Sequence, residues 1–239
     1  MDLRGLRITW LGHGTFRIDS PQNTSLLVDA WVDTNPACPP SQHQLGKLDA
    51  ILLTHGHGDH IGDVLPVITR TQPAQVVGNF ELCDWLEGKK VTNLVGMNKG
   101  GTITAAGASV TMVHADHSSA ISDGDRLIYG GEAGGYVIRF PEAPVIYAAG
   151  DTNIFGDMRL IAELYEPEIA ILPIGDFYTM GPREAALAAK LLGVKAVIPG
   201  HFGTFPVLSG TPAALRDELQ RIGLAGVEVL AVEPGQVIR

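Results

Sequence analysis

Apolar residues occur along the chain in short runs, and most runs are closed by glycine, proline or a charged side chain. Runs of four to eight residues that stay apolar or alternate with polar residues predict β-strands. The strands expected on this basis cover residues 7–11, 15–19, 25–30, 50–54, 76–78, 102–105, 109–114, 136–140, 145–149, 169–174, 196–199, 227–232 and 236–238. The run over 50–54 is apolar throughout, as expected of a strand buried on both faces.

Helical spacing of apolar residues predicts helices over 61–69, 81–86, 182–192 and 212–222. Pro182 lies in the first turn of the third helix, where proline is tolerated, and Thr211 is a suitable cap for the fourth. Residues 31–47 show no clear period and predict a loop. No linker or charge run interrupts the apolar segments, so we expect a single domain over residues 1–239.

The composition narrows the classes of partner. The formal net charge is −9 and no cluster of Lys or Arg occurs, so nucleic acid is not an expected partner. No run reaches the roughly 18 apolar residues of a membrane-spanning helix, so no membrane partner is expected. The first ten residues lack the apolar run of a signal peptide, which predicts a cytoplasmic protein. Cys38 and Cys83 are expected to be reduced thiols, because a pair this sparse makes no disulfide framework.

Four apolar strands each end in a polar side chain that can bind a metal ion. These side chains are His55, Asp151, Asp176 and His201. Residues just past strand ends lie on loops that a rigid sheet holds in place, and functional groups tend to lie on such loops. The ends of these strands are therefore the expected location of a functional site.

The densest group of such side chains is His55, His57, Asp59 and His60, within six residues. A lone histidine is usually a core or surface residue, but here three of the eight histidines share one turn, and its glycines let the backbone bend. His55 and His57 project to the same side of an extended segment. Asp59 and His60 follow the bend and can reach a second metal ion. Such ligands suit zinc, and also manganese, iron or cobalt.

This turn alone leaves a metal site incomplete, and His117, Asp151 and His201 are the candidates for the remaining ligands. His117 follows the strand expected over 109–114. His114 is close by, but it lies inside the apolar run, where a core position or a supporting role is more natural. We therefore favour His117 over His114 as a ligand.

At these residues the chain resembles the metallo-β-lactamase superfamily. That family carries a His-x-His-x-Asp-His motif, then a third His, a bridging Asp and a last His, and all are present here in this order. Within the superfamily, the chain is similar to a group of bacterial and archaeal metal-dependent hydrolases related to L-ascorbate-6-phosphate lactonase. The similarity covers nearly the whole chain, and the segments that support it are 10–13, 150–152, 156–158, 172–176, 180–182 and 204–206.

The resemblance implies an α+β fold, a four-layer αββα sandwich in which two mixed sheets are flanked by helices. It also implies two divalent metal ions, with zinc as the first choice. The implied ligand sets are His55, His57 and His117 for one ion and Asp59, His60 and His201 for the other, with Asp151 as the bridge.

Two divalent ions, two aspartates and one hydroxide together carry a net positive charge. Such a centre lowers the pKa of a bound water toward about 7 and stabilises developing negative charge. We therefore expect hydrolysis of an ester, lactone or phosphodiester in a small molecule, with Asp59 also taking the proton of the attacking water. An anionic substrate is compatible with this charge, and the sequence does not choose among these substrates.

Two other functions stay open, a di-iron oxidoreductase on the same scaffold and a metal-binding protein without catalysis. Relatives with di-iron chemistry place a carboxylate at the position of His57 and carry a flavin-binding domain, unlike this chain. His13 and Asp176 either stabilise turns or contact a ligand or the substrate. A homo-oligomer is left open, because the sequence does not separate interface residues from core residues.

Four aromatic residues flank candidate ligands and either wall a pocket or pack in the core. They are Phe177, Tyr178, Phe202 and Phe205.

Overall fold

The computed structural model describes all residues from Met1 to Arg239. Its first sheet has seven strands in the order β16-β1-β2-β3-β4-β5-β6. These strands are β1 (Arg7–Trp10), β2 (Phe16–Asp19), β3 (Ser25–Val28), β4 (Ala50–Leu52), β5 (Gln75–Asn79), β6 (Leu94–Met97) and β16 (Val237–Ile238). Neighbouring strands from β16 to β3 pair antiparallel and those from β3 to β6 pair parallel, so the sheet is mixed.

The second sheet also has seven strands, in the order β15-β14-β13-β12-β11-β8-β7. They are β7 (Thr102–Ala105), β8 (Ala108–His114), β11 (Gly134–Arg139), β12 (Ile146–Ala148), β13 (Ile169–Pro173), β14 (Ala196–Gly200) and β15 (Glu228–Val229). Strands β12 to β15 are parallel and the others antiparallel. A separate hairpin of β9 (Ala120–Asp123) and β10 (Arg126–Tyr129) lies between β8 and β11 in the chain.

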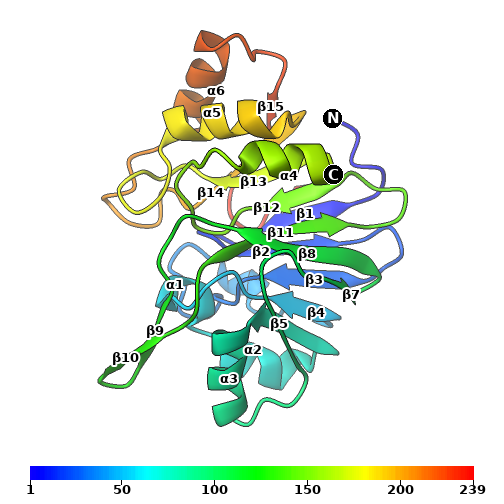
Figure 1. The fold of residues 1–239 in the computed structure, drawn as a ribbon, viewed down its shortest axis with the longest axis vertical. Helices are drawn as coiled ribbons and strands as arrows, with labels where there is room; N and C mark the ends of the chain where they lie inside the picture. The colour runs from blue at the N-terminus through cyan, green and yellow to red at the C-terminus, as the bar shows by residue number, and fades with distance from the viewer.

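Helices cover the outer faces of the two sheets (Figure 1). The helices α2 (Val64–Thr71) and α3 (Phe80–Gly88) lie on the first sheet, after the short α1 (Gly58–Ile61) and the 3-10 turn η1 (Pro40–Gln42). The helices α4 (Met158–Tyr165), α5 (Pro182–Leu192) and α6 (Pro212–Arg221) lie on the second. The expected α+β, four-layer αββα sandwich is thus confirmed. None of the helices is long and apolar enough to cross a membrane.

Three hydrophobic cores lie between the four layers. Because side chains alternate between the two faces of a strand, one strand can contribute to two of these cores. On β3, Leu26 and Val28 face the other sheet, whereas Leu27 packs beneath α2 and α3. On β13, Ile171 faces the first sheet and Leu172 packs under α4 and α5. Because successive side chains point to opposite faces, a strand buried on both sides must be apolar throughout.

The helix expected over 61–69 is wrong as a single element. The structure ends α1 at Ile61 and begins α2 at Val64. Between them, the carboxylate of Asp63 accepts hydrogen bonds from the backbone N–H groups of Val32 and Thr34, at 2.7 and 2.9 Å. These bonds tie the break between the helices to the loop over 31–47, a contact that no local pattern reveals.

Candidate metal centre

Seven candidate ligands from distant parts of the chain meet at one edge of the sandwich. The turn that holds His55, His57, Asp59 and His60 follows β4 of the first sheet. The second sheet supplies the other three, from the ends of β8, β12 and β14, and these are His117, Asp151 and His201. The site therefore lies across the junction of the two sheets, and each ligand candidate is held by the end of a strand or by the turn after it.

A glycine lets one of these turns approach the other sheet. Gly150 precedes Asp151 and has a φ of +64°, in the left-handed region that favours glycine. A Cβ atom at this position would lie 2.7 Å from Cβ of Thr54, the residue before His55. Only glycine fits here, so the turn after β12 can place the Asp151 carboxylate beside the turn after β4.

The nitrogen and oxygen atoms of these side chains form two neighbouring groups. One group joins His55, His57 and His117, and the other joins Asp59, His60 and His201 together with His13. A third set of close donors, Asp29 with His55 and His60, takes one histidine from each of these groups. Within each group the potential ligand atoms lie within 4.8 Å of one another.

Asp151 lies between the two groups. Its Oδ2 atom is 3.2 Å from Nε2 of His60 and 3.0 Å from Nε2 of His201, on one side. On the other side it is 3.7 Å from Nε2 of His117 and 4.0 Å from Nε2 of His55. A carboxylate that faces histidines of both groups is suitably placed to bridge two cations.

The donors of this cluster fit a metal ion better than they fit one another. His60 Nε2, Asp151 Oδ1 and His201 Nδ1 are buried and have no hydrogen-bond partner of acceptable geometry. A buried polar atom without a partner costs free energy, and metal coordination is one of the interactions that compensates for it. The chemistry also fits, since imidazole nitrogens and carboxylate oxygens are common zinc ligands.

The charges within the cluster are strongly coupled. Burial lowers the pKa of His60, but the carboxylates of Asp151 and Asp29 outweigh burial and hold it well above its usual range. Burial raises the pKa of Asp151, and His60 and His201 reverse this effect and hold it well below its usual range. At neutral pH Asp151 is thus a carboxylate, the form that binds a cation.

Asp29 is a functional residue that the sequence analysis missed. It is wholly buried at the end of β3, and its Oδ2 lies 2.6 Å from Nδ1 of His60. The backbone N–H and the hydroxyl of Thr54 also donate to this carboxylate, each at 2.8 Å. Such a bond fixes the ring of His60 and leaves Nε2 directed at the centre. The available signal was a carboxylate directly after an apolar strand, where a charged side chain is costly unless it is paired.

His13 contacts the cluster through Asp59. It is fully buried in the turn after β1, with Nε2 at 3.1 Å from Oδ2 of Asp59 and Nδ1 at 2.9 Å from Oγ1 of Thr204. Burial lowers the pKa of His13 to about 4, although the hydrogen bond with Asp59 opposes this. The imidazole is therefore neutral at pH 7, so it donates one hydrogen bond and accepts the other.

Two side chains weighed from the sequence lie outside the cluster. Asp176 is exposed, and its carboxylate accepts a hydrogen bond from the backbone N–H of Phe177 at 2.8 Å, which stabilises the turn after β13. His114 is also exposed rather than in the core, with Nδ1 3.1 Å from Nζ of Lys99 and its ring against Phe155. Neither residue makes a hydrogen bond to a candidate ligand.

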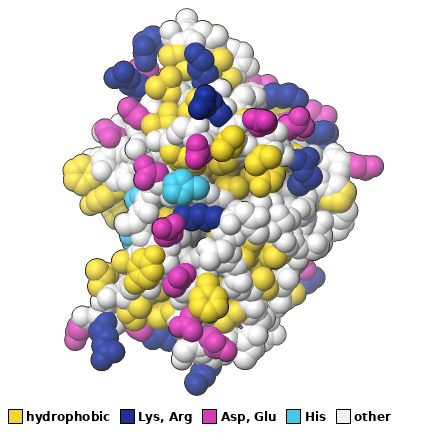
Figure 2. All heavy atoms as spheres, viewed as in Figure 1, with side chains coloured by type: hydrophobic (Ala, Val, Ile, Leu, Met, Phe, Trp, Pro, Cys, Tyr) yellow, Lys and Arg dark blue, Asp and Glu magenta, His cyan; other side chains and the backbone are white.

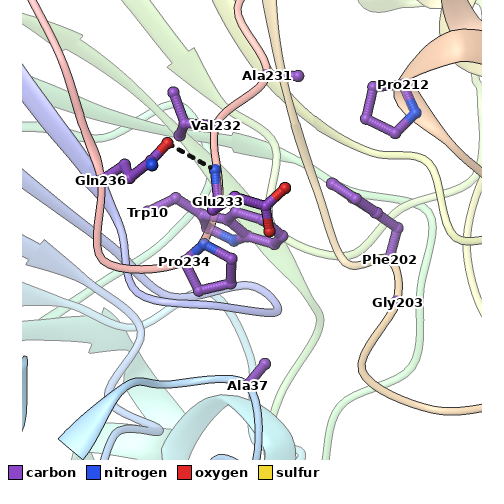
Figure 3. Close-up of a pocket in the computed structure, with 10 residues that line it drawn as sticks. All are labelled: Trp10, Ala37, Phe202, Gly203, Pro212, Ala231, Val232, Glu233, Pro234 and Gln236. Atoms are coloured by element: carbon purple, nitrogen blue, oxygen red, sulfur yellow. Dashed lines mark hydrogen bonds between the residues drawn. The ribbon is translucent and has the colours of Figure 1, made fainter.

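A cavity of about 670 Å³ opens directly over the candidate ligands, and Tyr178 forms part of its wall. A second cavity of about 410 Å³ is lined in part by Trp10 and Phe202, whose stacked rings have centroids 4.8 Å apart (Figure 3). Glu233 is the one charged residue of the second cavity, and it contains no histidine. We therefore assign the chemistry to the first cavity.

Basic and acidic side chains are mixed on the surface. Lys and Arg side chains are scattered over the face drawn in Figure 2 and form no continuous basic patch there. The chain carries 17 Lys and Arg against 26 Asp and Glu, which gives a formal net charge of −9 at pH 7.

Known proteins show the same fold and sequence pattern. Residues 24–202 match a family model described as a beta-lactamase superfamily domain. The chain is 55% identical to a UPF0173 metal-dependent hydrolase from Koribacter versatilis, over 90% of this chain and 92% of that protein. It is 50% identical to one from Solibacter usitatus, over 98% of this chain and all of that protein.

Solved structures share the fold of this chain. Igni18, described as a novel metallo hydrolase from Ignicoccus hospitalis, is 33% identical with a TM-score of 0.83, over 98% of this chain and 97% of that one. CmlA, a diiron β-hydroxylase from Streptomyces venezuelae, shares the fold at 17% identity, with a TM-score of 0.75 over 99% of this chain and 54% of that one. The chain belongs to the UPF0173 metal-dependent hydrolase family of the metallo-β-lactamase superfamily.

Proposed function

We propose that the protein hydrolyses an ester, lactone or phosphodiester bond of a small molecule at a centre of two divalent metal ions. The observation that carries this proposal is the position of Asp151, whose Oδ2 faces histidines of two separate donor groups. A single shared carboxylate between two sets of donors is the arrangement expected of a bridged pair of cations.

In this proposal the ligand sets are those that the resemblance implies. One ion would be held by His55, His57 and His117 and the other by Asp59, His60 and His201, with Asp151 shared between them. Zinc is the proposed metal, because neutral imidazole and carboxylate are its usual nitrogen and oxygen ligands. Manganese, iron or cobalt would accept the same donors.

Asp59 is the proposed catalytic carboxylate. When bound, the two ions supply an ionisable water at neutral pH and positive charge toward the substrate. Asp59 lines the cavity, and its side chain is partly exposed there, so it can accept a proton from a water in the cavity. Burial raises its pKa, but the hydrogen bond from His13 and the charge of His60 outweigh this and keep Asp59 ionised.

An oxidoreductase reaction at two iron ions is the second candidate, because the diiron enzyme CmlA has a similar fold. Iron found in the purified protein without zinc or manganese would favour the oxidoreductase. A fully metal-loaded protein that turned over no ester, lactone or phosphodiester would favour a binding protein without catalysis.

Three further properties belong to this proposal. They are a cytoplasmic location, a single domain over residues 1–239, and the relation to L-ascorbate-6-phosphate lactonase. A homo-oligomer also stays open.

The test of the proposed function is His57→Ala, with His114→Ala as the matched control. We expect His57→Ala to lose about one metal ion per chain and nearly all hydrolysis, because it removes a ligand. His114 lies outside the cluster, so His114→Ala should keep both. Metal content and turnover of a chromogenic ester and a chromogenic phosphodiester give the readouts. Wild-type turnover by His57→Ala would contradict the proposed mechanism.

A further inference from the structure

The outer wall of the cavity over the candidate ligands comes from two segments that carry no ligand. Ala120, Ser122 and Leu127 belong to the β9–β10 hairpin, and Tyr178 lies in the loop after β13. Figure 1 shows this hairpin projecting from the same side of the sandwich as the loops after β13 and β14. The hairpin and the β13 loop therefore form a wall around whatever group lies beside the metal ligands.

The register of the hairpin directs one of its faces into the cavity. Leu127 pairs with Ser122, and both line the cavity. The next pair, Ile128 with Ile121, points the opposite way, and Ile121 is wholly buried in the core beneath α2 and α3. Because side chains alternate along a strand, burial of Ile121 fixes Leu127 toward the cavity.

Large apolar side chains at the cavity rim remain exposed to solvent. Leu127 is 76% exposed and Tyr178 is 57% exposed, and the neighbouring Phe177 packs edge-on against Tyr178 with ring centroids 4.7 Å apart. Apolar area gains about 25 cal/mol per Å² when it leaves water, so a ligand that covers these side chains binds more tightly. Clustered exposed apolar groups beside a functional site are typical of a binding surface.

The same wall offers no cationic side chain to hold a remote anionic group, and Arg126 of the hairpin is not among the residues that line the cavity. No Lys or Arg lines the cavity, and its charged side chains other than histidine are Asp59 and Asp151. The lysines near the hairpin and β8 already have acidic partners, since Lys89 pairs with Asp123 and Lys99 with Glu132. A phosphate or carboxylate that contacted these apolar side chains would thus gain no cation in return for the water it displaced there.

We propose that this cavity selects substrates that are uncharged outside the scissile group and carry an apolar group next to it, which Leu127 and Tyr178 contact. This inference rests on the proposed function for the position of the scissile bond. It narrows the substrate class, because sugar phosphates and other substrates with a second anionic group are disfavoured.

The first readout compares how metal-loaded protein hydrolyses 4-nitrophenyl acetate, butyrate and hexanoate, which differ in acyl chain length. The 4-nitrophenyl hemisuccinate ester has the same chain length as the butyrate but carries a carboxylate. We expect kcat/KM to rise about tenfold from acetate to hexanoate and to be at least tenfold lower for hemisuccinate than for butyrate. Leu127→Ala and Tyr178→Ala should each reduce the chain-length preference about threefold. Leu127→Lys should abolish it and improve the hemisuccinate relative to butyrate.

The matched control is Leu164→Lys, which places the same charge at a leucine that is 68% exposed on α4 and absent from the cavity wall. We expect wild-type preferences from it. An unchanged preference in Leu127→Lys and Tyr178→Ala, or a wild-type protein that favours the hemisuccinate, would overturn the inference.

A binding readout separates this inference from the proposed function. Hydroxamates bind metal centres without turnover, so we compare the Kd of acetohydroxamate and hexanohydroxamate for the metal-loaded protein. Tighter binding of the longer compound, lost in Leu127→Lys but kept in Leu164→Lys, would support the apolar wall even if no ester were hydrolysed, and only the proposed function would then fail. Equal binding of both compounds together with an absence of turnover would overturn both.

Discussion

His13 donates a hydrogen bond from Nε2 to Oδ2 of Asp59 across 3.1 Å, from a position that is fully closed to solvent. On the other side of the ring, Thr204 donates to Nδ1 at 2.9 Å. The two bonds fix the tautomer and the plane of the imidazole, and so they fix the direction of the Asp59 carboxylate. His13 thus acts on the centre by positioning Asp59.

Removal of His13 should weaken metal binding at the centre that includes Asp59. We expect His13→Ala to lower the affinity for the more weakly held ion about 10-fold to 100-fold, as is usual for partners of metal ligands. His13→Gln keeps an N–H donor near the same place and should lose less. Titration against a chromogenic chelator measures both. Equal affinities in the wild type and both variants would show that Asp59 needs no support.

Gly14→Ala should disturb the centre by steric overlap. A Cβ at Gly14 would overlap the ring of His60, which is buried and held by Asp29. We expect this variant to lose about 1–3 kcal/mol of the unfolding free energy and to bind metal more weakly. Gly88→Ala is the control, because no atom lies within 4 Å of a Cβ placed there. Urea unfolding and metal titration provide the data, and wild-type behaviour of Gly14→Ala would refute the assigned position of His60.

Two buried tyrosines should respond differently to loss of their hydroxyl groups. The hydroxyl of Tyr136 donates to the backbone carbonyl of Leu53 at 2.7 Å, whereas the buried hydroxyl of Tyr147 has no partner. Tyr136→Phe should lower the unfolding free energy by about 1–2 kcal/mol. Tyr147→Phe should leave it unchanged or raise it, because it removes an unpaired polar atom from the core. Urea unfolding of the metal-free protein measures the unfolding free energy of both variants. An equal loss of unfolding free energy in the two variants would contradict this prediction.

Asp19 should contribute stability that depends on pH. Burial raises the pKa of Asp19, but hydrogen bonds from Arg17 and Ser25, at 2.9 and 2.6 Å, outweigh burial and lower it. A carboxyl whose folded pKa is lowered stabilises the fold above its unfolded pKa of about 3.9, and the stabilisation is lost as pH falls through the folded value.

We therefore expect Asp19→Asn to cost about 1–2 kcal/mol at pH 7 and progressively less below about pH 4. The comparison uses urea unfolding of metal-free protein at a series of pH values. Asp217→Asn, at an exposed position on α6, should match the wild type throughout. A cost for Asp19→Asn that did not shrink in acid would disprove the ionic contribution.

Strong local signals in the sequence predicted most of the fold. The helix expected over 182–192 has the bounds of α5, since Pro182 marks its start and Gly193 takes the left-handed conformation that ends it. The strands β6, β9 and β10 and the helix α4 were missed. The two hairpin strands have four residues each, and only Ile121 among them is buried, so their apolar pattern is short. The helix α4 is only eight residues long, so its amphipathic period is hard to detect.

The sequence likewise predicted some residues of the candidate site and missed others. The turn from His55 to His60 is visible in the sequence because its donors are neighbours in the chain. The role of Asp29 was not visible, because it depends on a contact with His60, 31 residues away. Tyr178 was noted as a residue that either walls a pocket or packs in the core, and the structure places it on the cavity wall. The position of Leu127 on the same cavity wall depends on the register of the β9–β10 hairpin, which the sequence pattern did not predict.

Four of the seven candidate ligands come from the sheet that contains β4, and three from the sheet that contains β12. In the proposed two-metal centre, ions held at that junction would link the two sheets, because the sheets could not separate there without breaking coordination bonds. Chelation would then loosen the molecule first at this edge, and faster backbone amide exchange would begin in the turns after β4 and β12 while the opposite end of the sandwich stayed closed.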